Sequence, residues 1–541
     1  MGLRITTLVG FTALFYFALV FNIYNIQIEQ GDHYSAKAAS VFNSSGVLEP
    51  VRGNIYFTDK KGNHIPVAIN RVSSLVFADN RQIEDLKETI EQSAAVFDIP
   101  KEELKDIFSK TNDPYEPLVR RADDKLLQKL EEHPISGVNI GHESIRFYPF
   151  GNIASHLLGY VTLDRSNYNG VYGLELEHNK GLKGAPGTVV DSDFVPPQNG
   201  ADLRLTIDYN IQSQAEDIIS SLVTDYGAVG GSVIVQDPDT GKILAMASFP
   251  SFDPNDYGRY PISSFLNPAV QSVYEPGSVF KVLTMAAGID SGALTKETTF
   301  YDAGSLILNG KTIRNWDLKA HGNVTMTNVI EKSLNTGAAF AEQKIGHEKF
   351  YNYLKEFGFK DSTGIGLPGE AIGSLDPLET NKRDINFATA SFGQGISVTP
   401  IQLISAISAL ANGGKLMKPL LLEESKSTRL GKPISPEASK QAIDMMVSAV
   451  NKAEVARING YTVAGKTGTA QVPDFKNGGY TKDVINTYVG FAPAYNPRFV
   501  ILIKLDKPAG APLAGRTVVP AFRELAQFVL NYYNVPPDNV E

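Results

Sequence analysis

The sequence predicts an α+β protein of several domains, on three observations. At 541 residues the chain exceeds the roughly 100 to 200 residues of a typical single domain. The run 5–28 is uncharged and apolar, although the chain as a whole has the 20% charged and 43% hydrophobic residues of a globular protein. From residue 201 onward, strand-like segments lie at both ends of a mostly helical region, which predicts a sheet assembled from distant segments and flanked by helices.

Residues 5–28 are expected to form a transmembrane helix. At a rise of 1.5 Å per residue the run reaches about 36 Å, enough to cross the hydrocarbon core of a bilayer. The alternative is a cleaved signal peptide, whose apolar core is usually about 7 to 15 residues long and directly followed by a cleavage site. Here a similar site, 36–38, lies only behind charged residues. Arg4 before the run and Glu29 after it place the tail 1–4 in the cytoplasm.

The composition excludes several kinds of chemistry. The chain has no cysteine, which removes disulfides, thiol nucleophiles and zinc–thiolate sites. Its eight histidines are scattered and form no H-E-x-x-H pattern, so we expect no metal and no other cofactor. The net charge of -9 offers no basic surface for a nucleic acid.

Residues 29–200 are expected to form a mixed α/β domain. The segments 83–97 and 101–110 carry apolar residues at helical spacing and charged residues between them, which is typical of helices packed on a surface. No chemistry is predicted for them. The turn-forming residues of 193–203 (DFVPPQNGADL) indicate a domain boundary near residue 200.

Residues 201–541 are expected to form a second domain. Apolar residues recur at helical spacing in 206–227, where Asp208 is placed to cap the helix and Gly227 to end it. Segment 231–248 contains two strand-like runs around a Pro-Asp-Thr-Gly turn, the pattern of a hairpin. Helices are then predicted over most of 278–455, strands in 461–472, 486–494 and 498–506, and a last helix in 518–533.

Ser278 and Lys281 stand three residues apart where a helix is predicted to begin. At this spacing both side chains lie on one face of the helix. A serine hydroxyl becomes a nucleophile when a base takes its proton, and an amine serves as that base only when it is unprotonated. Burial and the positive end of a helix both favour the neutral amine. Serine is also a preferred helix cap, so Ser278 is expected to cap this helix, and the pair alone favours a purely structural role for it.

Two further motifs reverse that reading. Ser333-Leu334-Asn335 precedes a Thr-Gly pair and fits a turn or a helix edge. Lys466-Thr467-Gly468 lies on a predicted strand, where an internal glycine indicates the close approach of another group. Ser-x-x-Lys, Ser-x-Asn and Lys-Thr-Gly in this order form the motif set of penicillin-binding proteins and class A β-lactamases.

On these motifs the chain resembles the class B penicillin-binding proteins, the membrane-anchored D,D-transpeptidases of peptidoglycan synthesis. The resemblance covers nearly the whole chain, including VRGNIYFTDKKGN, RFYPFGNIASHLLGYV, GVYGLELEHNKGLKG, ASFPSFDPN, FGQGISVTPIQL and TYVGFAPAYNPRF. YEPGSVFK and GFAPAYNPR are more similar to the septal, cell-division type than to the elongation type, which is the alternative. The resemblance implies an anchor at 5–28, a pedestal or dimerisation-type domain at 29–200, and a transpeptidase domain at 201–541 whose five-stranded antiparallel sheet is flanked by helices.

The resemblance also implies the catalytic residues. Ser278 attacks the penultimate D-alanine of a stem peptide and becomes acylated, and Lys281 is its general base. Ser333 relays a proton to the departing amine with Lys466 close by, and Asn335 orients Lys281 and the substrate amide. Leu334 departs from the aspartate of Ser-Asp-Asn, which places the chain away from class A β-lactamases.

The remaining implied residues hold the substrate. Lys466, Thr467 and Thr469 bind its terminal carboxylate, with Gly468 between them, because an ammonium and two hydroxyls suit a small anion. The backbone N–H groups of Ser278 and Thr469 form the oxyanion hole.

The same resemblance implies partners and a location. The donor is a stem peptide ending in D-Ala-D-Ala, the acceptor is an amine of a neighbouring stem, and β-lactams acylate the serine. No glycosyltransferase domain is predicted between the anchor and the middle region, so the expected partners include an integral-membrane glycan polymerase of the shape, elongation, division and sporulation (SEDS) family and other division proteins. The expected location is the bacterial cytoplasmic membrane, with one span and the catalytic domain outside.

Three other functions are less consistent with the sequence. A β-lactamase needs a base for deacylation, and Glu370 lies in a suitable stretch, but Ser374 stands where the class A pattern has asparagine. A membrane-bound β-lactam sensor needs a cytoplasmic output domain, and only about four residues precede the predicted anchor. A catalytically inactive scaffold is disfavoured because all three motifs are intact.

Overall fold

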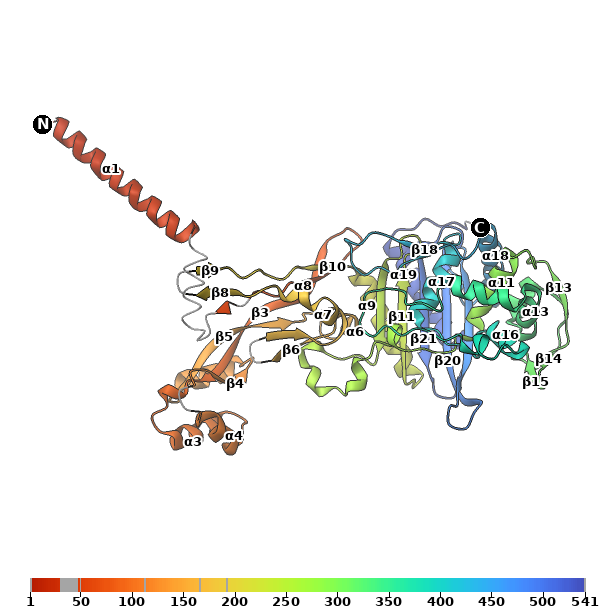
Figure 1. Cartoon of the computed structure of the whole chain (residues 1–541), viewed down its shortest axis with the longest axis horizontal. Coiled ribbons are helices and arrows are strands. Elements are labelled where there is room, and N and C mark those ends of the chain that lie inside the picture. The colour runs from red at the N-terminus through yellow and green to blue at the C-terminus, as the bar shows by residue number, and fades with distance from the viewer. Residues whose placement is uncertain are drawn as a thin grey trace. The chain divides into compact units, whose positions relative to one another are not determined.

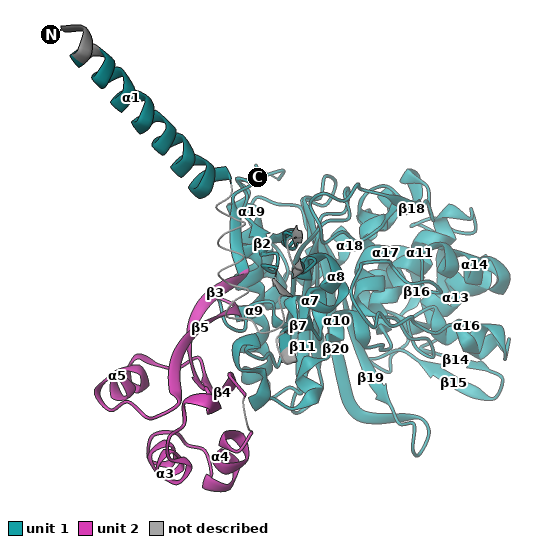
Figure 2. Cartoon of the chain, turned by 60° about the vertical axis from the view of Figure 1, so that its left-hand side comes forward, with its two compact units in different colours: residues 1–67, 150–541 teal, residues 68–149 magenta. Residues whose placement is uncertain are grey.

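The computed structural model describes residues 2–29, 47–48, 50–110, 113–164, 167–190 and 193–539. The chain divides into two compact units, a larger one made of residues 1–67 and 150–541 and a smaller one made of residues 68–149 (Figure 2). Residues from 150 onward therefore share a unit with the predicted second domain. The proposed division near residue 200 stays a prediction.

The apolar N-terminal run is helical, as predicted. Helix α1 (Gly2–Tyr24) continues as a π-helical turn, η1 (Asn25–Glu29). Within the described residues, Thr7–Glu29 is the one helix long and apolar enough to cross a membrane. Its large apolar side chains, such as Phe11 and Phe17, are exposed, which a lipid environment would accommodate.

The smaller unit is built on the part of a long strand, β3 (His64–Ala78), that runs from residue 68 onward. It pairs antiparallel with β4 (Glu116–Arg120) on one side and with β5 (Val138–Phe147) on the other. The two helices predicted here are confirmed as α3 (Leu86–Val96) and α4 (Lys101–Phe108), and α5 (Asp124–Glu132) follows. Their apolar faces pack on the sheet and form two small cores.

Between residue 47 and residue 208, the larger unit consists mostly of short elements, and a buried ion pair links Arg52 to Glu175. The guanidinium of Arg52 donates to Glu175 Oε2 over 2.8 and 2.5 Å, and both side chains are almost fully buried. The elements are β1 (Val47–Leu48), β2 (Ile55–Thr58), α6 (Ser155–Leu158), β6 (Val161–Asp164), β7 (Asn167–Gly170), α7 (Gly173–Glu177), α8 (Asn179–Lys183), β8 (Gly187–Val190), β9 (Asp193–Val195) and β10 (Leu203–Asp208).

A five-stranded antiparallel sheet forms the centre of the larger unit, as predicted. Its order is β12-β11-β21-β20-β19, so the hairpin β11–β12 joins strands that lie more than 200 residues later in the chain. Figure 1 shows this as yellow-green strands beside blue ones. The strands are β11 (Gly230–Gln236), β12 (Ile243–Phe249), β19 (Ala464–Pro473), β20 (Tyr480–Ala492) and β21 (Phe499–Asp506).

One face of this sheet is covered by two predicted helices, α9 (Tyr209–Asp225) and α19 (Val518–Tyr532). Asp208 caps α9 as expected, since its carboxylate accepts from the N–H groups of Asn210 and Ile211. The apolar sides of both helices and the inward residues of the strands form one large buried core.

Between β12 and β19 helices outnumber strands, but fewer than half of residues 278–455 are helical, so the prediction of a mostly helical stretch is confirmed only in part. Three small two-stranded sheets are inserted among the helices. The elements are η3 (Pro254–Arg259), η4 (Ile262–Phe265), α10 (Pro268–Gln271), η5 (Gly277–Phe280), α11 (Lys281–Asp290), β13 (Thr299–Asp302), β14 (Ser305–Leu308), β15 (Lys311–Arg314), β16 (Gly322–Thr325), α12 (Met326–Lys332), α13 (Asn335–Ile345), α14 (His347–Glu356), α15 (Asp376–Glu379), α16 (Asp384–Ala390), α17 (Pro400–Ala411), β17 (Leu416–Met417), β18 (Arg429–Gly431) and α18 (Pro436–Ala453).

Candidate active site

The third motif lies on an edge strand. β19 pairs only with β20 in the sheet, so no strand of the sheet covers its other edge. The turn η5 packs against this edge. Gly468 permits the close approach, because a Cβ at this position would lie 2.9 Å from the carbonyl oxygen of Pro276 and 2.9 Å from Val279 Cγ2.

Ser278 does not cap a helix, which corrects the sequence-based expectation. It is the second residue of the 3-10 turn η5, and α11 follows without a break. A capping residue needs an extended backbone, but Pro276 is already in the helical region with φ -71° and ψ -16°. Ser278 is half-buried, and its hydroxyl is not used to satisfy the turn.

The second motif lies between two helices. Ser333 ends α12 in the left-handed conformation with φ 57°, which is uncommon for a residue other than glycine, and Asn335 begins α13. The fully buried side chain of Leu334 holds this corner in place, and its N–H donates to the carbonyl of Val329 over 3.0 Å. Such strain persists only where the surroundings fix it, and it is common at functional sites.

Lys281 is fully buried and joins the first motif to the second. Its Nζ donates to the carbonyl oxygen of Ser333 over 2.6 Å and to Asn335 Oδ1 over 2.8 Å, and it lies 3.2 Å from Ser333 Oγ. Burial, together with the charge of Lys466, lowers the pKa of Lys281 well below its usual value. This shift favours the neutral form of the amine.

Lys466 approaches the same serine from β19. Its Nζ lies 3.1 Å from Ser333 Oγ and 3.0 Å from the carbonyl oxygen of Thr467, so the Ser333 hydroxyl bridges two lysines. Burial lowers the pKa of Lys466 to about 7. Burial thus lowers the pKa of both lysines, and the charge of Lys466 adds to the shift of Lys281.

Thr467 of the third motif and Thr469 just after it are half-buried on one face of β19. Thr467 Oγ1 lies 3.4 Å from Lys466 Nζ, beside the position expected for an anion. Thr469 Oγ1 accepts from the N–H of Ala514, the first residue of η6 (Ala514–Arg516). The structure thus brings all the predicted site residues into the packing of η5, the α12–α13 corner and β19.

The residues that support Asn335 were not predicted from the sequence. Asn315 Oδ1 accepts from the N–H groups of Asn335 over 3.0 Å and of Thr336 over 3.3 Å, in place of a cap on α13 itself. Asp302 in turn accepts from Asn315 and from Thr336. No sequence pattern pointed to this cluster, because its members come from three separate segments.

Glu370, the residue considered as a β-lactamase base, is occupied by its own loop. Its carboxylate accepts from Thr363 N over 2.7 Å, from Thr363 Oγ1 over 2.6 Å, from Ser362 Oγ over 2.5 Å and from Gly364 N over 3.2 Å. These bonds stabilise a turn and engage both carboxylate oxygens.

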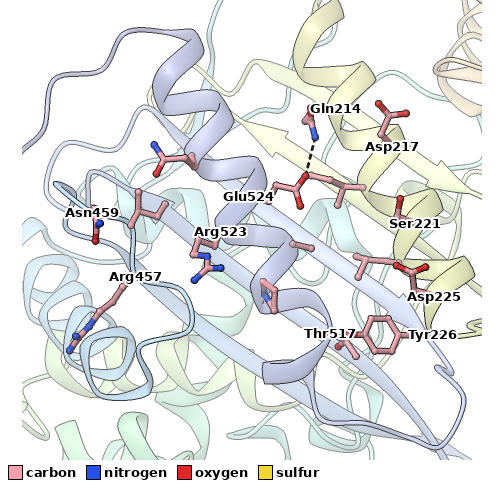
Figure 3. Close-up of a pocket in the computed structure, with 16 residues that line it drawn as sticks. Gln214, Asp217, Ser221, Asp225, Tyr226, Arg457, Asn459, Thr517, Arg523 and Glu524 are labelled. Carbon is pink, nitrogen blue, oxygen red and sulfur yellow. Dashed lines mark hydrogen bonds between the residues drawn. The ribbon is translucent and has the colours of Figure 1, made fainter.

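A cavity of about 730 Å³ lies on the helix-covered face of the sheet, between α9 and α19 (Figure 3). Its lining mixes acidic residues such as Asp217 with basic ones such as Arg523, and Gln214 donates to Glu524 within it over 3.4 Å. It contains no residue of the three motifs. Among the described residues, no group of three His, Asp or Glu side chains is arranged to hold a metal ion.

Comparison with known protein families decides the identity. Residues 231–527 match the penicillin-binding protein transpeptidase domain. The chain belongs to the class B penicillin-binding proteins. Residues 47–192 match the penicillin-binding protein dimerisation domain, the second domain of this family. The chain is thus a peptidoglycan D,D-transpeptidase by family, with an α+β transpeptidase domain and an N-terminal apolar helix.

Individual relatives of this penicillin-binding protein extend over nearly its whole length. Stage V sporulation protein D of Bacillus subtilis is 35% identical, covering 91% of this chain and 80% of its own. Peptidoglycan D,D-transpeptidase FtsI of Escherichia coli is 28% identical, covering 94% and 87%. The crystal structure of penicillin-binding protein 3 from Mycobacterium tuberculosis, complexed with aztreonam, superposes with a TM-score of 0.71 at 28% identity, covering 91% and 98%.

Gly468→Val is expected to reduce acylation of this penicillin-binding protein by a β-lactam about 100-fold, because the added side chain pushes η5 away from β19 and a displacement near 1 Å costs rates of this order. Stopped-flow measurement of acylation, with the melting temperature as a control for folding, tests this. Gly258→Val is a suitable control, since no atom lies within 4 Å of a Cβ there. Equal rates for Gly468→Val and the natural protein would contradict the close-approach role.

Proposed function

We propose that this penicillin-binding protein cross-links peptidoglycan stem peptides through an acyl-enzyme on Ser278. The observation that carries the proposal is the bridge from Lys281 through the Ser333 hydroxyl to Lys466. Two buried amines of lowered pKa around one hydroxyl form a relay that accepts a proton at one end and supplies one at the other.

In the first half-reaction, Ser278 Oγ attacks the carbonyl carbon of the penultimate D-alanine and passes its proton to Lys281. The N–H groups of Ser278 and Thr469 stabilise the negative oxygen of the tetrahedral intermediate, a contribution of typically about 2.7 to 4 kcal/mol for one such donor. The C–N bond then breaks, and the amine of the terminal D-alanine takes a proton delivered through Ser333. The products are free D-alanine and an ester on Ser278.

In the second half-reaction, an amine of a neighbouring stem attacks this ester. Its proton passes back into the relay, the new amide forms and Ser278 regains its hydrogen. Asn335 orients the amine of Lys281 in both halves. Lys466, Thr467 and Thr469 hold the terminal carboxylate of the donor in the first half only, because that carboxylate leaves with the released D-alanine. A β-lactam follows the first half only, because its opened ring stays attached to the acyl group and keeps the acceptor amine out.

The pH dependence of acylation follows from these lysines. A lysine is a cation below its pKa and neutral above it, so Lys466 loses its charge as the pH rises through about 7. The second-order acylation rate constant for benzylpenicillin, whose carboxylate needs that charge, is expected to fall over this range. Stopped-flow rates across the range test it, with Lys466→Arg as the comparison that stays charged. A constant that rises steadily through pH 7 would contradict the assignment.

The cross-linking activity is tested with purified protein. Incubation with a pentapeptide-bearing glycan and an acceptor amine should release D-alanine and yield dimeric muropeptides on digestion. D-alanine release without dimers would identify a carboxypeptidase, whereas penicillin labelling with neither product would identify a sensor.

We further propose a septal role. Full-length similarity to Stage V sporulation protein D and to FtsI supports it, as do the segments YEPGSVFK and GFAPAYNPR. Depletion should then stop division and leave growing cells without cross-walls, whereas widening of cells that still divide would indicate the elongation type.

We also propose the domain division 1–4, 5–28, 29–200 and 201–541, with one membrane span and the transpeptidase domain outside. A SEDS-type polymerase and other division proteins are the proposed partners of the anchor and the pedestal. Exchanging the anchor for an unrelated one and mutating the pedestal should abolish co-purification with the polymerase and preserve penicillin labelling. Unchanged co-purification and activation of the polymerase would contradict this partnership.

A further inference from the structure

A carboxylate near the nucleophile joins three segments of the larger unit. Glu275, three residues before Ser278, accepts from the N–H of Gly395 over 3.0 Å and from the hydroxyl of Tyr480 over 3.0 Å at its other oxygen. No role was predicted for Glu275 from the sequence. We call these three residues the Glu275 clasp.

The clasp spans the two segments that carry the proposed oxyanion hole. One donor, the N–H of Ser278, belongs to η5, and the other, the N–H of Thr469, belongs to β19. Tyr480 begins β20 and pairs with Pro473, the last residue of β19. A bond from Glu275 to Tyr480 therefore connects the chain just before Ser278 to the far end of the strand that carries Thr469.

The contact between η5 and β19 is close because a glycine lies on each side. Gly468 of β19 faces η5, and a Cβ on Gly277 of η5 would meet Ala470 Cβ at 3.0 Å. The bonds of Glu275 add a polar connection to this packing. On the opposite side, Gly277 N donates to the carbonyl of Gly393 over 3.0 Å, so the loop that holds Gly395 is itself tied to η5.

We propose that Glu275 and Tyr480 are positioning residues that set the distance between the two N–H donors of the oxyanion hole. The inference rests on the proposed acylation of Ser278. The N–H donors stabilise the transition state only when they already point at the oxygen that becomes negative. The hydrogen-bonded link between their two segments therefore contributes more to the acylation step than to the non-covalent binding of the β-lactam.

Tyr480→Phe is expected to lower the first-order acylation constant for benzylpenicillin about fivefold, the effect of one hydrogen bond of about 1 kcal/mol, and to leave the non-covalent dissociation constant unchanged. Glu275→Gln should lower the same constant to a similar extent. The double variant should be acylated no more slowly than the slower of the two single variants, since both substitutions remove the same hydrogen-bonded link. Stopped-flow acylation on the full chain separates the two constants.

Tyr495→Phe is the matched control. It removes a similar bond, from the Tyr495 hydroxyl to Asp444 over 2.8 Å, on a pair that lies outside the three motifs. It should acylate at the natural rate. The infrared carbonyl band of the acyl-enzyme adds a readout that stability alone does not move, because weaker donors shift it to higher wavenumber in Tyr480→Phe.

The possible results distinguish a failure of the positioning role from a failure of the proposed acylation of Ser278. A natural protein that penicillin does not acylate at Ser278 would overturn the proposed function. Acylated natural protein with an unchanged rate and carbonyl band in Tyr480→Phe would overturn the clasp alone, as would rate losses in the two single variants that add fully in the double one.

Discussion

Replacing Ser278 with alanine is expected to abolish covalent labelling by a fluorescent penicillin. Only the serine oxygen forms the ester that survives denaturation, so its loss removes the product itself. Gel fluorescence of the natural and variant chains, with circular dichroism to verify folding, makes the comparison. The half-buried side chain loses one oxygen and no capping bond, so the melting temperature should change little.

A serine of the same region provides the control for Ser278→Ala. Ser291 lies just after α11, and its hydroxyl donates only to the carbonyl of Gly288 over 3.1 Å. Ser291→Ala should label as strongly as the natural protein. Equal labelling of Ser278→Ala and Ser291→Ala would overturn the assignment of the nucleophile.

Replacing Lys281 with methionine is expected to slow acylation about 10²- to 10⁴-fold, the usual contribution of a general base. Methionine fills the buried space, so the loss reports the missing amine more than a cavity. Stopped-flow mixing with a chromogenic β-lactam measures the rate.

Lys281→Arg distinguishes the two roles open to Lys281. An arginine keeps a positive charge and does not give up its proton, so it cannot serve as the base. If Lys281 takes the serine proton, the arginine variant acylates as slowly as the methionine variant. Recovery of the natural rate in Lys281→Arg would show that charge alone is required.

Much of the transpeptidase fold was predictable because its signals are local. The α9 cap at Asp208, the hairpin 231–248 and the strands after residue 460 all follow from patterns within a few residues, and the structure confirms them. The three motifs were identifiable by their order, and the family match agrees with them.

The unpredicted features depend on contacts between distant segments. Ser278 was predicted to be a helix cap, because nothing in the neighbouring sequence indicates that the helical backbone already begins at Pro276. The support of Asn335 by Asn315 and the link from Glu275 to Tyr480 cross about 20 and 205 residues of sequence. Asparagine, glutamate and tyrosine are common in solvent-exposed loops, so only the folded structure shows which of these residues make bonds within the protein.

The most direct test of the central claim uses the natural substrate. The purified protein is mixed with a stem pentapeptide ending in D-Ala-D-Ala, quenched in acid and digested for mass spectrometry. The account predicts release of D-alanine and a peptide that contains Ser278 and carries the acyl group as an ester. An acyl group on any other residue, or D-alanine release from the Ser278→Ala chain, would contradict it.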